Sequence, residues 1–305
     1  MQGNLGSGVI QTPTRVCYAY GARYTYDATV VLNDNTVRIT PYADAHQAMV
    51  RHTVATTPRG TQVEFKDRFG NTVHRLRVTE HHKELQMVAV AVMDLVPWSQ
   101  VVPDLPLCTV RYPADAEEFL GESPLINPPD MLALARDIVG RTEGLVAAVD
   151  RTVMWVYQKI EYKKGVTNVT TRAETVAMLR QGVCQDKTHL ALGLLRSLNI
   201  PCRYISGMLT DQAGDTHAWI EFLHPTLGWL PADPTKGRVA QLGLDYLKLA
   251  VGRDYTDVPP VIGSFASSGS GRLDRVYACV LTGRRDLTID EAMPLVGLDM
   301  REAKR

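Results

Sequence analysis

The sequence predicts an α+β fold, in which an N-terminal antiparallel β-sandwich domain precedes a core of helices packed on an antiparallel sheet. Short apolar runs alternate with turn residues over residues 16–110, a pattern typical of strands. Apolar residues then recur at helical spacing between residues 130 and 198, and two further strand-like runs follow. The 305 residues are enough for one large domain or two ordinary ones.

The N-terminal β domain is expected over residues 16–110. Two strand-like runs flank Asp67-Arg68-Phe69-Gly70-Asn71, whose composition predicts the turn of a hairpin. A long apolar strand is expected over residues 85–96, and strands at this spacing favour an antiparallel sandwich or barrel. Residues 1–15 are expected to form a loose leader before the first strand.

Composition marks the remaining boundaries. Residues 111–129 are rich in proline and are expected to be a linker. The α+β catalytic domain is expected over residues 130–265, and residues 266–305 are expected to form a C-terminal strand and a polar tail. That strand, over residues 273–281, is a candidate to return to a sheet.

Helices are expected within the second domain. The first runs from Pro128-Pro129-Asp130 to about residue 141, and the second covers residues 145–160. A third begins at Thr171-Arg172-Ala173-Glu174, which fits a capping box, and ends near Gly182. The next helix begins at once, around Cys184.

The bulk composition excludes several classes of protein. Lysine plus arginine and aspartate plus glutamate number 33 each, so no excess charge favours a nucleic-acid or anionic-membrane partner. No apolar run approaches the length of a membrane span, and the N-terminus lacks the basic and apolar regions of a signal peptide. The oligomeric state is not predicted.

The cysteines indicate neither a disulfide framework nor a zinc knuckle, because their number is odd and none forms a Cys-x-x-Cys pair. Together they favour a cytoplasmic protein. The five are Cys17, Cys108, Cys184, Cys202 and Cys279.

Cys184 is the candidate nucleophile. It follows the turn residue Gly182 and starts a run in which leucines recur at helical spacing from Leu190 to Leu198. A thiol at a helix N-terminus meets unpaired backbone N–H groups and the positive end of the helix dipole, which stabilise thiolate over thiol. The thiolate is the nucleophilic form of cysteine.

His217 and Asp233 are the candidate base and orienting carboxylate, on two successive strand-like segments. Strand alternation places Ala218 and Ile220 toward the core and His217 on the opposite face. If the turn between the two strands is centred on Pro225, residue 217 pairs with residue 233. A turn centred one residue later shifts the partner of residue 217 by about two residues. Either register brings Asp233 near His217.

Other acids and histidines fit the role less well. His189 lies about 140° round the helix from Cys184, and His224 lies in the turn with the opposite strand parity. Asp215 precedes His217 on the same strand, and Asp186 lies in a first helical turn where the dipole favours an acid. His81 and His82 face opposite ways on a strand, so they are not expected to bind a metal together.

Four further residues are candidates for the substrate cleft. Trp219 and Trp229 fit either cleft walls or ordinary packing. Gln185 and Tyr162 are candidates for a second donor to an oxyanion, beside the backbone N–H of Cys184.

Three sequence blocks together resemble the transglutaminase-like superfamily, which has the papain-like thiol fold. They are Gly182-Val183-Cys184-Gln185-Asp186, Thr216-His217-Ala218-Trp219-Ile220-Glu221 and the stretch from Gly228-Trp229 to Asp233-Pro234-Thr235. Tyr24-Thr25-Tyr26 and Val37-Arg38-Ile39-Thr40-Pro41 are similar to the N-terminal β domain of the bacterial and archaeal branch. Gly252-Arg253-Asp254-Tyr255-Thr256-Asp257-Val258-Pro259-Pro260 is similar to its C-terminal signature. The resemblance covers roughly residues 16–282.

The resemblance implies that Cys184 is the nucleophile, His217 the base and acid, and Asp233 the orienting carboxylate. Lys187-Thr188 stands where this branch usually has an aromatic-alanine pair, a departure that bears on packing or pocket shape more than on chemistry. The resemblance implies no metal or organic cofactor, and the sequence has no acidic loop of the kind that binds calcium in some animal relatives.

The implied chemistry is acyl transfer on a peptide or protein amide through a Cys184 thioester. Hydrolysis by a cysteine protease or amidase ranks first, because that is the common expectation for microbial members. Transamidation is the alternative, since both reactions share every step up to the thioester. A catalytically silent binding module, and a zinc site formed by Cys184, His217 and Asp233, remain open as further interpretations.

Overall fold

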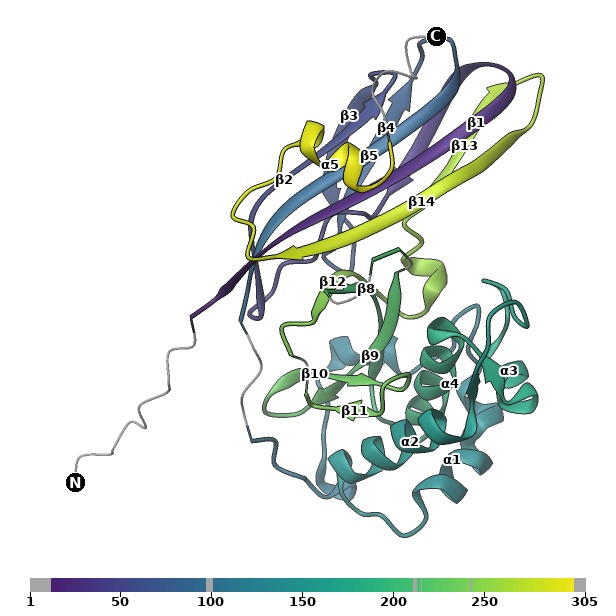
Figure 1. Ribbon diagram of the computed structural model, residues 1–305. Helices are drawn as coiled ribbons and strands as arrows, with labels where there is room; N and C mark the ends of the chain where they lie inside the picture. Colours follow the sequence, from purple (N-terminus) through teal and green to yellow (C-terminus); the bar gives the residue numbers. More distant parts are fainter. Residues whose placement is uncertain (1–11, 97–100, 211–212, 215, 242, 299–305) are drawn as a thin grey trace.

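The computed structural model describes residues 12–96, 101–210, 213–214, 216–241 and 243–298. It contains a seven-stranded sheet and a five-stranded sheet, and the helices of the second unit lie beside the five-stranded sheet (Figure 1). The expected α+β class is confirmed, with a strand-rich N-terminal region before a helix-and-sheet core. Most of the expected leader, residues 1–11, lies outside the described residues.

The N-terminal region forms one curled antiparallel sheet organised around a long central strand, β1. The first part of β1 pairs with β5 on one side and β14 on the other, and its last part pairs with β4 and β13. The strand order is β2-β5-β1-β4-β3, so β2 and β3 are edges. The strands are β1 Thr14–Val37, β2 Gln47–Thr57, β3 Thr61–Lys66, β4 Thr72–Val78, β5 His82–Leu95, β13 Val261–Ser267 and β14 Gly271–Thr282.

The expected hairpin at residues 67–71 is confirmed, because β3 and β4 pair from Lys66 opposite Thr72 onward. Asp67 builds the turn: its carboxylate accepts the backbone N–H groups of Phe69 and Asn71, each at 3.0 Å. An aspartate that binds the backbone ahead of it is a common way to fix a turn.

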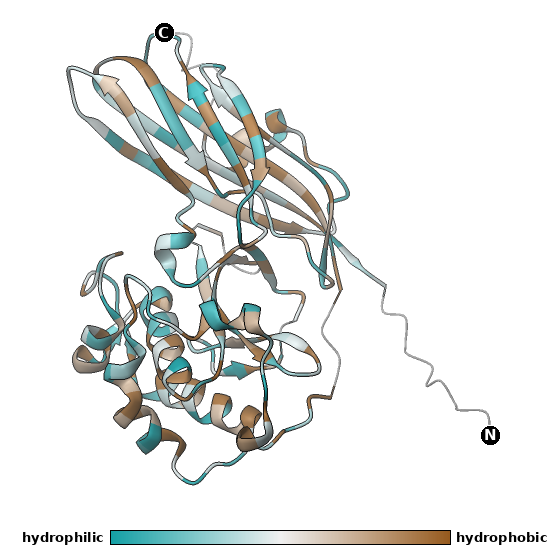
Figure 2. Cartoon of the chain, turned by 180° about the vertical axis from the view of Figure 1, so that it is seen from behind, coloured by the Kyte–Doolittle hydropathy of each residue, from teal (hydrophilic) through white to brown (hydrophobic). Residues whose placement is uncertain are grey.

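The C-terminal segment returns to the N-terminal sheet. β14 pairs antiparallel with the part of β1 from Val16 to Tyr26. The domain boundary expected at residue 265 therefore falls inside a strand, β13. A short helix, α5 (Ile289–Leu295), then lies across the sheet (Figure 1). Alternate residues of the strands explain its position, since Cys17 and Ala19 face α5 while the residues between them face the other way. Figure 2 shows hydrophobic and hydrophilic residues interspersed along the strands of this sheet.

The core unit joins four α-helices to a five-stranded antiparallel sheet of order β11-β10-β9-β8-β12. Its α-helices are α1 Leu132–Val139, α2 Leu145–Lys159, α3 Ala173–Leu179 and α4 Cys184–Ser197. Its strands are β8 Cys202–Leu209, β9 His217–His224, β10 Gly228–Asp233, β11 Arg238–Val239 and β12 Tyr246–Gly252, with a separate parallel pair β6 Glu161–Tyr162 and β7 Gln181–Gly182. Short 3₁₀ turns are η1 Leu107–Thr109, η2 Ala114–Phe119, η3 Pro128–Met131 and η4 Tyr255–Asp257.

Helix α4 is the centre of this core. It is buried from Asp186 to Arg196, and its leucines pack with Ala218, Ile220 and Phe222 of β9. The predicted strand parity of β9 is therefore confirmed. Burial of this continuous apolar surface stabilises the position of the helix, and with it the position of its first residue.

The expected capping box at Thr171 is wrong. Helix α3 begins one residue later, after Arg172, which has no side-chain cap. The carboxylate of Glu174 instead accepts the backbone N–H of Asn127 at 2.8 Å, so it fastens α3 to the segment before α1.

Buried polar side chains hold the N-terminal sheet against the core. The side-chain amide of Asn71 donates to the Val251 carbonyl at 2.8 Å, and its oxygen accepts the Val251 N–H at 2.7 Å. Gln47 makes the equivalent pair of bonds to the backbone of Lys248. Both glutamine and asparagine are buried, so losing either would leave unpaired backbone groups inside the junction.

A membrane-spanning helix needs about 20 apolar residues. The longest helix in the described ranges, α2, has 15 residues. Across those ranges no helix has both the length and the apolar character needed to cross a membrane.

Candidate active site

Cys184 is the first residue of α4, and the turn before it is tightly fixed. The carboxylate of Asp186 accepts the Val183 N–H and the Thr167 hydroxyl, each at 2.7 Å. Gly182 is required beside it, because a Cβ at that position would lie 2.6 Å from the Asp186 Cβ. Burial raises the pKa of Asp186. The Cys184 side chain is half-buried at this helix N-terminus.

His217 begins β9 and lies between Cys184 and Asp233. Its Nε2 is 2.8 Å from Asp233 Oδ2, and the ring also forms a side-chain hydrogen bond with Cys184. Since Nε2 is engaged by the carboxylate, Nδ1 is the nitrogen available to the sulfur. The three residues therefore form a chain in the order thiol, imidazole and carboxylate, which is the arrangement that nucleophilic catalysis requires.

The hairpin has the second of the two registers considered from the sequence. Ala232 lies opposite Ile220, so by continuation Asp233 lies opposite Trp219 and diagonally from His217. The diagonal distance is short enough for an imidazole to reach a carboxylate. Thr235 and Lys236 donate their backbone N–H groups to Asp233 Oδ1 at 2.7 and 3.1 Å, which fixes the carboxylate.

Tyr246 is a fourth member of the cluster that sequence reasoning missed. Its hydroxyl donates to Asp233 Oδ2 at 2.7 Å, the same oxygen that faces His217. Tyr246 belongs to β12, at the far edge of the sheet from β10, and the sequence around it carries no signal for this contact. The order of the strands in the folded sheet places the Tyr246 ring against Trp219, with 5.2 Å between the two ring centroids.

The surroundings of His217 favour its charged form. Burial alone would lower its pKa, but the hydrogen bonds to Asp233 and Cys184 and their charges raise the pKa to about 9. Burial likewise opposes the ionised form of Asp233, but the bonds from His217 and Tyr246 hold the pKa of that carboxyl below its usual value. The cluster is thus electrostatically suited to an imidazolium between a thiolate and a carboxylate.

Two adjoining hollows meet at Cys184 and His217. The larger, of about 460 Å³, lies between α4 and the N-terminal sheet, and the smaller, of about 360 Å³, continues past the thiol. The sheet supplies an aromatic and apolar wall to the larger hollow, formed by Tyr20, Tyr24, Val261, Leu273 and Val276. The cleft is therefore formed jointly by both units of the chain.

Of the four cleft candidates, Gln185 and Tyr162 line this cleft. Tyr162 also lines the smaller hollow, and its side chain is half-exposed. The Gln185 amide donates to the Val169 carbonyl at 3.2 Å.

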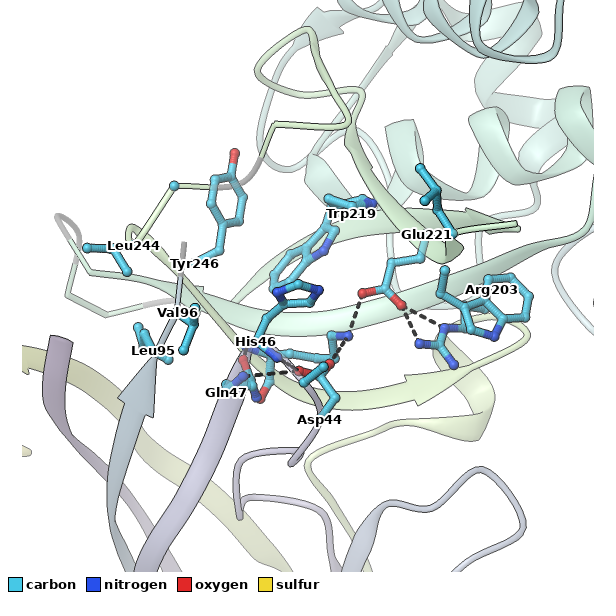
Figure 3. A pocket seen from close by; sticks show the side chains of 16 residues that line it. Asp44, His46, Gln47, Leu95, Val96, Arg203, Trp219, Glu221, Leu244 and Tyr246 are labelled. Carbon is cyan, nitrogen blue, oxygen red and sulfur yellow. Dashed lines mark hydrogen bonds and ion pairs between the residues drawn. The ribbon is translucent and has the colours of Figure 1, made fainter. Parts of the chain in front are cut away.

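Trp219 and Trp229 line a different cavity, which Figure 3 shows. Trp219 is fully buried and packs directly on Gly207, where an added Cβ would lie 2.2 Å from the indole ring. Trp229 packs edge-on against Phe119, and the guanidinium of Arg203 lies 4.4 Å from its ring centroid. Both tryptophans line this second cavity and neither of the two hollows at Cys184, so they are not found among the cleft walls expected for them. Trp219 instead stacks on the His217 ring, with 6.0 Å between the ring centroids.

That second cavity borders a buried network of charges. Glu221 accepts from both Arg203 and Lys248, and Lys248 Nζ also lies 2.7 Å from Asp44 Oδ2 (Figure 3). Opposing charges keep the pKa of Glu221 low although burial opposes its ionised form. Asp44 belongs to the N-terminal region, so this network also contributes to the junction.

The rival residues lie apart from the thiol. His189 is fully buried on α4 and accepts the Tyr255 N–H at 3.2 Å, while His224 Nε2 contacts the Pro103 carbonyl at 3.0 Å. Asp215 lies outside the described residues. The zinc interpretation of the triad does not fit, because Asp233 bonds the far side of the His217 ring and the three ligand atoms do not converge.

Comparison with known proteins identifies relatives of both units of the chain. Residues 132–234 match the transglutaminase-like superfamily, and residues 19–94 match the bacterial transglutaminase-like N-terminal region. Uncharacterized proteins of Mycobacterium leprae and Mycobacterium tuberculosis are each 28% identical to this chain. The first alignment covers 86% of this chain and 96% of the relative, and the second 79% and 84%.

A crystal structure described as "a Putative Cysteine Protease from Cytophaga hutchinsonii" has the same fold. It superposes with a TM-score of 0.73 and 23% identity, over 90% of this chain and 93% of the other. Both units and their arrangement are shared, and each of the two matched families accounts for one of them. The chain therefore belongs to the transglutaminase-like superfamily and carries the bacterial transglutaminase-like N-terminal region.

Proposed function

We propose that this chain hydrolyses amide bonds of peptides or proteins through a thioester on Cys184. The observation that carries the proposal is the hydrogen-bonded order of Cys184, His217 and Asp233 at the N-terminus of α4. A thiol needs a base to hold its proton and a carboxylate to orient that base, and each partner is available at bonding distance.

The proposed reaction begins when the Cys184 sulfur attacks the substrate carbonyl carbon. The developing oxyanion would accept the Cys184 backbone N–H, because the first N–H groups of a helix have no partner within the helix. Gln185 and Tyr162 line the cleft beside it and are the candidates for a second donor. The His217 imidazolium gives its proton to the departing amine as the C–N bond breaks.

Water completes the cycle. His217, now neutral, takes a proton from a water molecule as that water attacks the thioester carbonyl, and the C–S bond breaks to release the acid and regenerate the thiolate–imidazolium pair. Hydrolysis ranks above transamidation because both hollows beside the thiol are open to solvent. An amine acceptor would have to exclude that water.

A peptide or protein is the proposed substrate class. Two hollows of about 460 and 360 Å³ meet at Cys184, which is more room than a small amide needs. The aromatic and apolar wall contributed by the N-terminal sheet favours an apolar side chain near that bond.

Brief treatment with limiting iodoacetamide near neutral pH, followed by peptide mass spectrometry, tests the nucleophile. Cys108 is exposed and lies outside the cleft, so its labelling rate in the same molecule is the control. We expect Cys184 to react several-fold faster than Cys108, and His217→Ala to slow Cys184 alone. Equal rates that do not respond to the mutation would overturn the proposal and favour a silent binding module.

Product analysis then separates the two reactions. Peptide substrates are incubated with wild-type and Cys184→Ala protein, with and without a primary amine. A free acid that depends on Cys184 in both conditions supports hydrolysis, whereas a conjugate formed only with the amine would replace hydrolysis with transamidation.

A further inference from the structure

A second cluster of functional groups lies in the N-terminal sheet, far along the chain from the triad and independent of the proposed function. It consists of His52 on β2, Glu64 on β3 and His74 on β4. Each residue offers one ligand atom, and these three atoms all lie within 4.8 Å of one another. We propose that these three residues bind a zinc ion that joins the edge strand β2 to the β3–β4 hairpin.

The chemistry of the donors suits zinc. Two imidazoles and one carboxylate are a donor set that catalytic and other open zinc sites use, with a fourth position left to water or another oxygen. Around a tetrahedral zinc ion, ligand atoms lie about 3.4 Å apart for bonds of about 2.1 Å. His52 Nε2 and His74 Nδ1 lie 2.9 and 3.7 Å from Glu64 Oε2, on either side of that value.

His74 has the tautomer that a metal ligand needs. Its Nε2 lies 2.8 Å from the buried Thr40 hydroxyl, and its Nδ1 lies 2.9 Å from the Gln62 amide nitrogen. An amide N–H that donates to Nδ1 requires a lone pair there, so the proton resides on Nε2 and points to Thr40. A ring whose second nitrogen donates to a fixed oxygen is the usual arrangement behind a metal-binding histidine.

The charge of the donor set also fits. The carboxylate of Glu64 offers a negative charge to a divalent cation, and imidazoles bind metals through a ring nitrogen that carries no proton. Gln62 would move off Nδ1 when the ion binds, and its side chain, exposed on an edge strand, is free to do so.

The position of the cluster indicates that a bound ion would stabilise the edge of the sheet. β2 and β3 are the two ends of the strand order and share no ladder, although only residues 58–60 connect them. Glu64 lies directly opposite His74 in the β3–β4 pair, so the same face of both strands carries the ligands. All six residues of β3 are exposed, and β3 pairs only with β4. A zinc ion would therefore attach an edge strand that has little buried surface of its own.

Zinc titration of the full-length chain by calorimetry, after treatment with a chelator, tests the site. The Cys184→Ala protein is used throughout, because a reactive thiolate also binds zinc. We expect one zinc ion per chain and a rise in the melting temperature with added zinc. Cobalt, substituted for zinc, should give the visible spectrum of a tetrahedral nitrogen–oxygen site without a thiolate band.

His52→Gln and Glu64→Gln are the test variants, since both side chains are partly exposed and tolerate the change without burial of a new group. Each is expected to weaken zinc binding at least about tenfold and to remove the thermal shift. His81→Gln, which removes an exposed histidine outside the cluster, is the matched control and should bind like the parent. Zinc binding that is absent from the parent, or equal in all three variants, would overturn the proposal.

Discussion

His189 and His217 are both buried in the same core, yet their rings meet opposite kinds of partner. His217 Nε2 faces the carboxylate of Asp233 at 2.8 Å. His189 Nε2 accepts a backbone N–H, that of Tyr255, at 3.2 Å. The first partner favours a protonated ring and the second requires a lone pair, so the two regions hold histidine in different charge states.

The pKa values follow from that difference. Burial lowers the pKa of His189 to about 4, and the nearby Asp254 opposes this without reversing it. The Asp254 carboxylate is already occupied by the N–H groups of Leu125 and Thr256. At His217 the carboxylate bonds the ring itself, and the pKa rises to about 9. A carboxylate near a histidine is therefore not sufficient to charge it, because the direct hydrogen bond decides the outcome.

Asp233→Ala should have the largest effect on the difference in pKa between His217 and His189, because it removes the carboxylate that bonds the His217 ring. Loss of the orienting carboxylate should lower kcat/KM on the order of 10³-fold. The imidazolium should also lose its proton at lower pH, so the alkaline fall in kcat/KM, expected near pH 9 in the wild type, should shift downward. The pH profile of peptide hydrolysis measures both effects. Asp245→Ala, which removes a carboxylate paired with Arg238, should leave the profile unchanged, and an unmoved alkaline limb in Asp233→Ala would contradict the assignment.

His189 should make the fold sensitive to acid. Its folded pKa lies below the usual value of about 6.5, so the unfolded chain binds the extra proton first as the pH falls. The free energy of unfolding should therefore decrease between about pH 6.5 and pH 4, by on the order of 2–3 kcal/mol from this residue. Urea unfolding of wild type and His189→Gln at several pH values measures it. The variant should show a shallower acid slope, and parallel slopes would rule out this contribution.

His217 should have the opposite effect on stability. Its folded pKa lies above the usual value, so its contribution is fully present below about pH 6.5 and is lost as the pH rises through about 9. The same urea series, extended to pH 10, should show a smaller alkaline loss of stability in His217→Gln than in wild type. Lysines and tyrosines outside the cluster are common to both proteins, so the difference between the two curves reports on His217 together with its bonded partners Cys184 and Asp233. No difference would mean that Asp233 does not stabilise the charged ring.

Local patterns in the sequence predicted where the three candidate residues lie in the fold, while their catalytic roles stay a prediction. The helix start at Cys184 and the parity of His217 depend on a few neighbouring residues, and the register of the hairpin was limited to two choices. The fold class followed from the same periodicities. Each of these features is determined within one element or one hairpin, where spacing alone carries the information.

Features that depend on sheet order could not be predicted in this way. Trp219 and Trp229 line the second cavity, which the N-terminal region helps to form, and not the cleft at Cys184. The predicted hairpin already places Glu64 opposite His74, but His52 joins them only because the folded sheet brings β2 close to β3, with which it shares no ladder. Tyr246 reaches Asp233 from the opposite edge of the five-stranded sheet. No local pattern encodes which strands become neighbours in these cases.

Tyr246→Phe gives the smallest and most specific test, because it removes one hydroxyl and keeps the ring that packs on Trp219. The hydroxyl bonds the same Asp233 oxygen that faces His217, so its loss should let the carboxylate and the imidazole drift from their alignment. We expect kcat to fall about tenfold, equivalent to about 1.4 kcal/mol, with little change in KM because Tyr246 does not line the cleft at Cys184.

Tyr112→Phe is the matched control for this variant, since the Tyr112 hydroxyl has no hydrogen-bond partner among the residues that the structure describes. Kinetics of peptide hydrolysis at saturating substrate compare the two proteins. A fall in kcat confined to Tyr246→Phe would identify Tyr246 as a positioning residue that acts through Asp233. A kcat of Tyr246→Phe that stays at the wild-type value, like that of Tyr112→Phe, would instead mean that the backbone N–H groups of Thr235 and Lys236 alone are enough to hold the carboxylate in place.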